Sequence, residues 1–163
     1  LALGSEMLRL GGVAKTDDGE RAAMRAAIQN GSAARTMERM IEAQGGDPRV
    51  VAEPSRLVVA DVVTEIVAPS AGYVTRVDAL DMGLSAVALG AGRTRADQAV
   101  DPAVGIELCA PRGTKVSRGD VLAKILSRSA EAGAKIQDRV LAAFTIEDAA
   151  AETPALVLER IGA

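Results

Sequence analysis

The sequence predicts an α+β fold, in which a helical lead is followed by a domain with a mostly antiparallel sheet. Up to about residue 48, apolar residues recur at helical spacing and are interrupted by glycine pairs and turn residues. From about residue 58, short runs rich in Val and Ile alternate with turns that contain Gly or Pro, a pattern typical of strands. Helices followed by a strand-rich segment are characteristic of the α+β class.

Three short helices are predicted in the lead. The first covers residues 1–10 and stops at a glycine pair. The second starts near Asp17, which we expect to cap it while Glu20 reaches back as in a capping box, and it ends at an Asn-Gly pair. The third covers residues 32–43. Helices of this length are marginal alone, so we expect them to pack on the following domain and to leave one face for further chain.

Residues 49–57 form a predicted linker, and strands follow it. Runs at 57–59 and 62–67 are rich in β-branched residues, and a turn at Pro69 leads to a strand over residues 73–77. The remaining predicted elements are a buried helix over 79–89, strands over 104–109 and 121–126, a helix over 130–144 and a last strand over 155–161.

Composition excludes several classes of function. The chain has 163 residues and a formal net charge of −3, so no overall basic field indicates nucleic-acid binding. The single cysteine, Cys109, allows no disulfide within the chain, and we expect it to be a small buried hydrophobe because no histidine is present to activate it. Without a signal peptide or an apolar run long enough to span a bilayer, the expected location is the cytoplasm, with no membrane partner.

A glycine-broken basic loop follows the helix over residues 79–89 and contains Gly90, Gly92, Arg93 and Arg95. Such a loop can bring backbone N–H groups and positive charge to a phosphate. However, it lacks the lysine–serine ending of a Walker loop, and it follows a helix instead of opening one as a dinucleotide fingerprint does. The sequence by itself favours a helix C-terminal cap followed by a solvated basic loop.

Carboxylates are the other candidate site residues. Asp78 is well placed to cap the helix over 79–89. Asp97 and Asp101 could ligate a metal, but neither an EF-hand pattern nor a His/Cys cluster accompanies them. We therefore predict capping and solvation for these carboxylates, with no metal site and no catalytic acid–base pair.

Several separated motifs resemble one known family. Residues 72–79 read GYVTRVDA, 89–93 read LGAGR and 101–106 read DPAVGI, while upstream 1–8 read LALGSEML and 43–48 read AQGGDP. In this order they resemble the thymidine phosphorylase and pyrimidine-nucleoside phosphorylase family, in its C-terminal part. The resemblance covers nearly the whole chain.

The resemblance implies a domain organisation and a parent activity. Residues 1–48 would be helices at the end of a large α/β domain, 49–57 a linker and 58–163 the family's C-terminal α+β domain. The parent would be a homodimeric pentosyltransferase that converts thymidine or a related pyrimidine nucleoside and inorganic phosphate into the free base and a pentose 1-phosphate, with no cofactor. The loop of Gly90, Gly92, Arg93 and Arg95 would be an element of cleft closure.

The motifs that carry the family's chemistry do not occur in this chain. The family uses a lysine–serine phosphate segment, a glycine-rich loop, a catalytic histidine and an arginine, serine and lysine that hold the base. These 163 residues contain no histidine and no Lys-Ser pair. No catalytic or substrate-binding residue is therefore carried over, and we expect the chain to be inactive without the upstream α/β and α domains.

Two alternatives remain open at this point. Residues 65–74 and 113–125 resemble the two halves of a biotinyl or lipoyl carrier, which implies a barrel-sandwich (α/β hammerhead) shape and allows a non-catalytic carrier or interaction module. A carrier needs a modifiable lysine at a hairpin tip between its halves, whereas Lys115 and Lys124 lie within the second half. The other alternative is an enzyme with a pocket lined by Arg93, Arg95 and nearby carboxylates.

Overall fold

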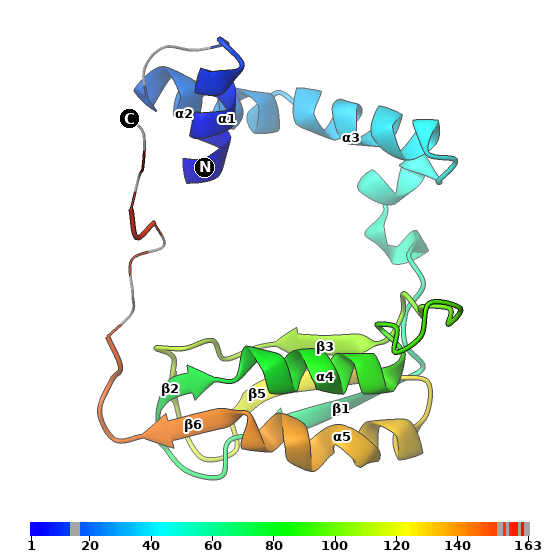
Figure 1. Ribbon diagram of the computed structural model, residues 1–163, viewed down its shortest axis with the longest axis vertical. Helices are drawn as coiled ribbons and strands as arrows, with labels where there is room; N and C mark the ends of the chain where they lie inside the picture. The colour runs from blue at the N-terminus through cyan, green and yellow to red at the C-terminus, as the bar shows by residue number, and fades with distance from the viewer. Residues whose placement is uncertain (14–16, 153–154, 156, 160, 162–163) are drawn as a thin grey trace. The chain divides into compact units, whose positions relative to one another are not determined.

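The computed structural model describes residues 1–13, 17–152, 155, 157–159 and 161 (Figure 1). The chain divides into two compact units, unit 1 with residues 1–57 and 156–163, and unit 2 with residues 58–155. Helices and antiparallel strands both occur, which confirms the predicted α+β class.

Unit 1 contains the three predicted helices. These are α1 (Ala2–Leu10), α2 (Asp17–Gln29) and α3 (Ser32–Ala43), followed in the predicted linker by the 3₁₀ turns η1 (Pro48–Val51) and η2 (Pro54–Arg56). The proposed cap on Asp17 concerns a side chain outside the described residues. Glu20 is fully buried, and its carboxylate pairs with Arg9 of α1 at 3.4 Å, so it joins two helices.

The described part of unit 1 has no apolar core of its own. Its only buried residues are Ser5 and Glu20, both polar. Large apolar side chains on all three helices are exposed instead, among them Leu3, Met7, Leu10, Ile28, Met37 and Met40. Since helices of this size depend on burying an apolar face, these surfaces are suited to packing against further protein.

Unit 2 is built on two antiparallel sheets. The first has the order β1-β5-β3, from Val62–Val67, Val121–Ser127 and Gly105–Leu108; the second has the order β4-β2-β6, from Lys115–Val116, Gly72–Val77 and Phe144–Glu147. Neither sheet closes into a barrel among the described residues.

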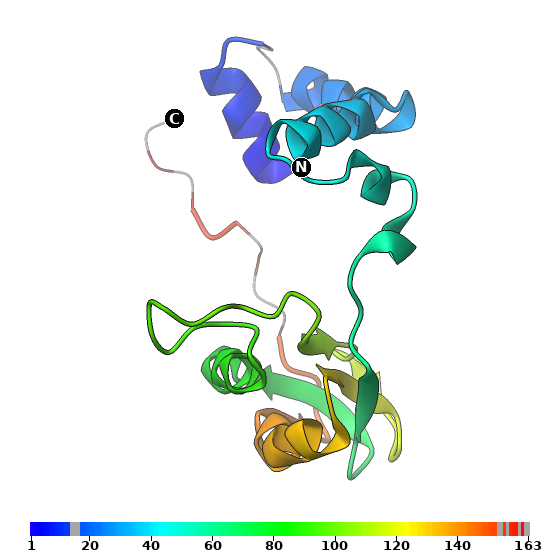
Figure 2. The same cartoon turned by 90° about the vertical axis from the view of Figure 1, so that its right-hand side faces the viewer.

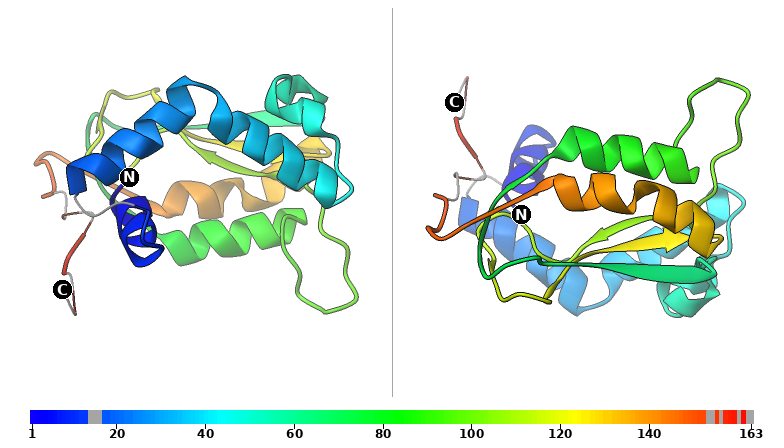
Figure 3. Two further views of the ribbon diagram at one scale, coloured as in Figure 1. Left: turned by 90° about the horizontal axis from the view of Figure 1, so that it is seen from above. Right: turned by 90° about the horizontal axis from the view of Figure 1, so that it is seen from below.

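Two helices cover one face of the first sheet. Helix α4 (Ala79–Leu89) and helix α5 (Ala130–Ala142) lie side by side, and α5 packs on β1 and β5 while α4 reaches β3 (Figures 2 and 3). One core cluster lies beneath them, formed by Ile66, Ala123, Ile125, Ile136 and Val140. A second joins the two sheets, formed by Ala68, Val74, Ala110, Val116 and Leu122.

Several predicted boundaries are wrong, and tertiary pairing explains them. The helix predicted to reach Phe144 ends at Ala142, because Phe144 begins β6 and pairs with Val77 of β2. Residues 57–59 form no strand, and regular pairing starts at Val62. The last strand, over 155–161, is absent in its described residues 155, 157–159 and 161, and 153–154 lie outside the description.

Two burial predictions are also corrected. Cys109 is exposed, because it lies one residue beyond β3. The helix over 79–89 is only partly buried, with Leu80 and Leu84 exposed and Ser85 fully buried. It packs beside α5 and over one strand, so one side of it remains on the surface.

Candidate functional site

The predicted basic loop begins where α4 ends. Gly90 is the C-cap of α4 with a φ of 106°, and the amide of Ala91 donates to the carbonyl of Ala86 at 3.0 Å. Glycine takes this left-handed conformation without the steric cost of a Cβ atom. Gly92 lies against the helix so closely that a Cβ there would come within 2.6 Å of Val87 Cγ2. The two glycines therefore turn the chain back over the last turn of α4.

The tip of the loop is held by local polar contacts. Arg95 Nη2 donates to Asp97 Oδ2 at 2.6 Å, and this hydrogen bond lowers the pKa of the Asp97 carboxyl. The amide and hydroxyl of Thr94 both donate to Gln98 Oε1, at 3.1 and 2.9 Å. Arg93 is exposed, and no ion pair to it is seen in the described part of the chain. The tip is thus a solvated basic turn that stands out beyond α4 (Figure 3).

The base of the loop closes at Asp101. The amide of Asp101 donates to the carbonyl of Gly90 at 2.9 Å, so the two ends of the loop meet. The Asp101 side chain accepts from the amide of Ala103 at 3.0 Å, which fixes the turn into β3. Residues 90–101 therefore form a loop with touching ends, a kind of loop that often carries function.

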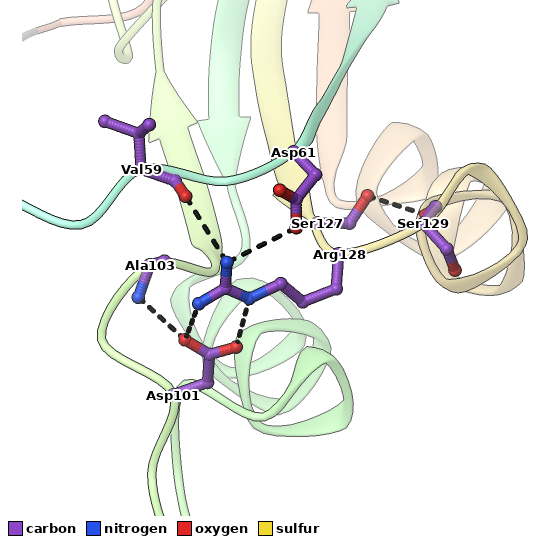
Figure 4. A network of polar contacts seen from close by, with 7 residues as sticks. All are labelled: Val59, Asp61, Asp101, Ala103, Ser127, Arg128 and Ser129. Carbon is purple, nitrogen blue, oxygen red and sulfur yellow. Dashed lines mark hydrogen bonds and ion pairs between the residues drawn. The ribbon is translucent and has the colours of Figure 1, made fainter.

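Arg128, directly after β5, binds the base of this loop (Figure 4). Its Nε donates to Asp101 Oδ2 at 2.7 Å and its Nη2 to Asp101 Oδ1 at 2.9 Å, a bidentate contact. Its Nη1 donates to Asp61 Oδ2 at 3.3 Å and to the carbonyl of Val59 at 3.4 Å. One guanidinium thus joins the loop to the segment just before β1.

These contacts perturb the titration of both partners. The hydrogen bond from Arg128, followed by that from the Ala103 amide, lowers the pKa of the Asp101 carboxyl below its ordinary value. Hydrogen bonds to Asp101 and then to Asp61 raise the pKa of the Arg128 guanidinium. At neutral pH the Asp101 carboxylate is negatively charged and the Arg128 guanidinium is positively charged, so the two side chains form an ion pair.

The structure assigns the carboxylates singled out by the sequence to helix capping and ion pairing. Asp78 is the N-cap of α4 and accepts from the amide of Asp81 at 3.0 Å, as predicted. Asp97 and Asp101 lie in the same loop but pair with different arginines, Arg95 and Arg128. Within the described ranges, no cluster of three or more His, Cys, Asp or Glu side chains is placed to hold a metal.

The two lysines considered for a carrier lie in strands. Lys115 is in β4, with its ammonium 5.8 Å from the centre of the Tyr73 ring. Lys124 is in β5 opposite Glu65 and Glu107, and its Nζ lies 3.8 Å from the Glu107 carboxylate. Neither lysine is at a hairpin tip between the two halves, so the structure gives the carrier hypothesis no support.

An apolar groove of about 360 Å³ lies between α4, β2 and β3. Its lining residues are Val77, Ala79, Met82, Ala86, Ile106 and Leu108. None of them is charged, so the groove is unsuited to phosphate. Neither Arg93 nor Arg95 lines this groove. It therefore differs from the enzyme pocket, lined by those two arginines, that the sequence left open as an alternative.

The network around Arg128 was missed by the sequence analysis. Arg128 is separated from Asp101 by 27 residues and from Asp61 by 67. No periodicity or motif connects positions so far apart. Only the antiparallel pairing of β1, β5 and β3 brings their ends together.

Comparison with known proteins agrees with the family resemblance seen in the sequence. Residues 73–147 match the family described as pyrimidine nucleoside phosphorylase C-terminal domain. The chain is 35% identical to a thymidine phosphorylase of Burkholderia orbicola, 36% to one of Mesorhizobium japonicum and 33% to one of Agrobacterium fabrum, in each case over 99% of this chain. The chain spans 37% of the length of these relatives.

None of the described helices combines the length and the apolar character that crossing a bilayer requires. Three of the motifs that carry the family resemblance, GYVTRVDA, LGAGR and DPAVGI, lie in the matched region or at its edge, and the similarity to thymidine phosphorylases continues through the helices of unit 1. Residues 73–147 thus form a domain of the pyrimidine nucleoside phosphorylase C-terminal family, within a chain that is similar to thymidine phosphorylases over nearly its whole length.

Proposed function

We propose that this chain is the C-terminal part of a thymidine phosphorylase, and that the complete enzyme converts thymidine and phosphate into thymine and 2-deoxyribose 1-phosphate. The observation that carries the proposal is the similarity to thymidine phosphorylases, which extends over 99% of the chain. On this proposal the complete protein is a homodimeric, cytoplasmic pentosyltransferase that uses inorganic phosphate as co-substrate and needs no further cofactor.

The chemistry supports a site that lies outside these residues. Phosphorolysis requires an anion site, groups that stabilise charge on the leaving pyrimidine, and support for a cationic sugar in the transition state. This sequence has no histidine. Arg76, Arg95, Arg128 and Arg139 are each engaged by a neighbouring aspartate. We infer that the chain alone is inactive and that the upstream domains supply the catalytic groups.

We assign residues 90–95 a role in closing the cleft over substrate. Gly90 and Gly92 lie outside regular helix, and the side chains of Arg93 and Arg95 are exposed on the loop, although Arg95 is paired with Asp97. A small basic loop with closed ends can move as a unit and present charge to an anionic substrate.

We further propose that residues 1–48 pack against the upstream α/β domain and that the two sheets of unit 2 form a barrel-sandwich, or α/β hammerhead, arrangement. Support for the first comes from the apolar side chains of α1, α2 and α3 that are exposed while only polar residues are buried in the described part of unit 1. Support for the second comes from the shared apolar cluster that joins β2 and β4 of one sheet to β5 of the other.

Fragment complementation tests the function. Thymine release from thymidine is measured with this chain alone, and then with the chain mixed with the upstream part of the Burkholderia orbicola relative, with and without phosphate. We expect no release from the chain alone and phosphate-dependent release from the mixture.

A matched pair of variants on α1 makes this test specific. Met7→Asp places a charge on the exposed apolar face and should abolish complementation, whereas Glu6→Gln leaves that face apolar and should preserve it. Release by the chain alone, after intact mass has excluded a longer species, would show that catalytic groups lie within these 163 residues.

A further inference from the structure

Arg128 holds together two segments of unit 2 that lie far apart in the sequence. Its side chain donates two hydrogen bonds to Asp101, one to Asp61 and one to the carbonyl of Val59 (Figure 4). Two of the four bonds reach the loop, and two reach the segment before β1.

The first segment, residues 58–61, is where the chain enters unit 2 from the linker. It has no regular secondary structure, and Val58 and Val59 are exposed. In the described structure, both of the side-chain hydrogen bonds that hold this segment come from Arg128. Its order therefore depends strongly on where the guanidinium lies.

The second segment is the loop over residues 90–101, and Arg128 holds it at its closing point. The backbone amide of Asp101 donates a hydrogen bond to the carbonyl of Gly90, and the Asp101 carboxylate accepts one from the amide of Ala103. The position of Asp101 therefore determines where both ends of the loop lie. The Asp101 side chain is 29% exposed, against 63% for Asp61, so the loop contact is the better shielded of the two.

A guanidinium is planar, and its N–H donors are fixed relative to one another. It therefore cannot keep its hydrogen bonds to two partners if those partners move in different directions. The two nitrogens that bind Asp101 fix the plane in which the third must meet Asp61 and Val59. A shift of residues 58–61 therefore changes the hydrogen bonds from Arg128 to Asp101. In the same way, a shift of the loop changes the hydrogen bonds from Arg128 to residues 58–61.

We propose that Arg128 couples the entry of the chain into unit 2 to the loop over residues 90–101, so that order in one segment stabilises order in the other. The coupling itself does not depend on catalysis, but its use rests on the proposed role of this loop in closing over substrate. In that setting, movement at the linker would be transmitted to the closing loop through one side chain.

The test uses the whole chain and NMR. The loop is followed by amide hydrogen exchange of Asp101 and Ala103, whose N–H groups are hydrogen-bonded, and the entering segment by ¹⁵N order parameters of residues 58–61. Asp61→Asn should speed amide exchange at Asp101 and Ala103 by about two- to five-fold, the size that an exposed ion pair supports. Asp101→Asn should lower the order parameters of residues 58–61, since coupling between sites is reciprocal.

Two further variants make the result specific. Arg128→Lys keeps the charge but loses the fork, and should loosen both segments together. Asp97→Asn breaks the Arg95 pair at the loop tip and should leave residues 58–61 unchanged. Fluorescence of Tyr73, the single tyrosine and part of unit 2, reports whether each variant is folded.

The proposal is overturned if Asp61→Asn affects only residues 58–61, if Asp101→Asn affects only the loop, or if neither has any effect. Because no substrate is involved, these outcomes are independent of whether the complete protein is a thymidine phosphorylase.

Discussion

Two buried serines in unit 2 differ in whether the hydroxyl has a hydrogen-bond partner. Ser85 in α4 and Ser127 at the end of β5 are both fully buried. The Ser127 hydroxyl donates to the carbonyl of Ser129 at 2.9 Å, whereas the Ser85 hydroxyl has no hydrogen-bond partner in the described structure. A buried polar group without a partner keeps its desolvation penalty.

We predict opposite effects from the same substitution at these two positions. Ser85→Ala should stabilise unit 2 by about 1 kcal/mol, because it removes an unsatisfied hydroxyl, while Ser127→Ala should destabilise it by about 1 kcal/mol through loss of a bond. Urea unfolding followed by Tyr73 fluorescence measures both. Equal destabilisation by the two variants would mean that Ser85 has a partner in solution.

At the scale of elements, α4 starts at a cap that depends on pH. The pKa of Asp78 lies below its ordinary value, first because its carboxylate accepts from the amide of Asp81 and further because Arg76 is close. A carboxyl with a lowered folded-state pKa stabilises the protein above its unfolded pKa, and this contribution is lost as pH falls through the folded pKa.

Substitution of Asp78 should therefore show a pH-dependent cost. Asp78→Ala should lower the melting temperature near neutral pH, and the difference from the wild type should shrink well below pH 3.8, the ordinary pKa of the group. Asp78→Asn keeps a neutral acceptor for the cap, so its smaller deficit near neutral pH should reflect only the lost charge. Thermal scans by circular dichroism across this range check both, and a deficit for Asp78→Ala that does not change with pH would contradict the charged cap.

At the scale of the whole molecule, the two units differ in what holds them together. All the buried apolar residues of the described chain belong to unit 2, between Ile66 and Ala143. Unit 1 has only a buried Ser5 and a buried Glu20 paired with Arg9 among its described residues. Burial of apolar area is the main source of folding stability, so the units should differ in their ability to fold alone.

We expect a fragment of residues 58–152 to unfold cooperatively with nearly the melting temperature of the whole chain. A fragment of residues 1–57 should show little helical signal, because isolated helices of this length are marginal. Circular dichroism of the two fragments tests this. A stable, cooperative unit 1 would contradict the view that its exposed apolar faces need a partner.

Local chemistry explains which parts of the fold were predictable. Helices α3 and α4 were placed at their observed ends, because turn and glycine residues bound the first and because Asp78 and Gly90 cap the second. Short sequence motifs likewise indicated the family, and the match over residues 73–147 confirms this prediction. These features depend on neighbours within a few residues.

What the sequence could not show depends on contacts between distant residues. Phe144 was predicted to end a helix and β6 was not predicted, since only pairing with β2 makes Phe144–Glu147 a strand. Asp101 looked like a solvated carboxylate until the folded sheet brought it to Arg128. The sequence alone therefore determined the class, the helices and the family, whereas the tertiary structure decided the register of the strands and the network at the loop, because ion pairs and strand pairs across tens of residues exist only once the chain has folded.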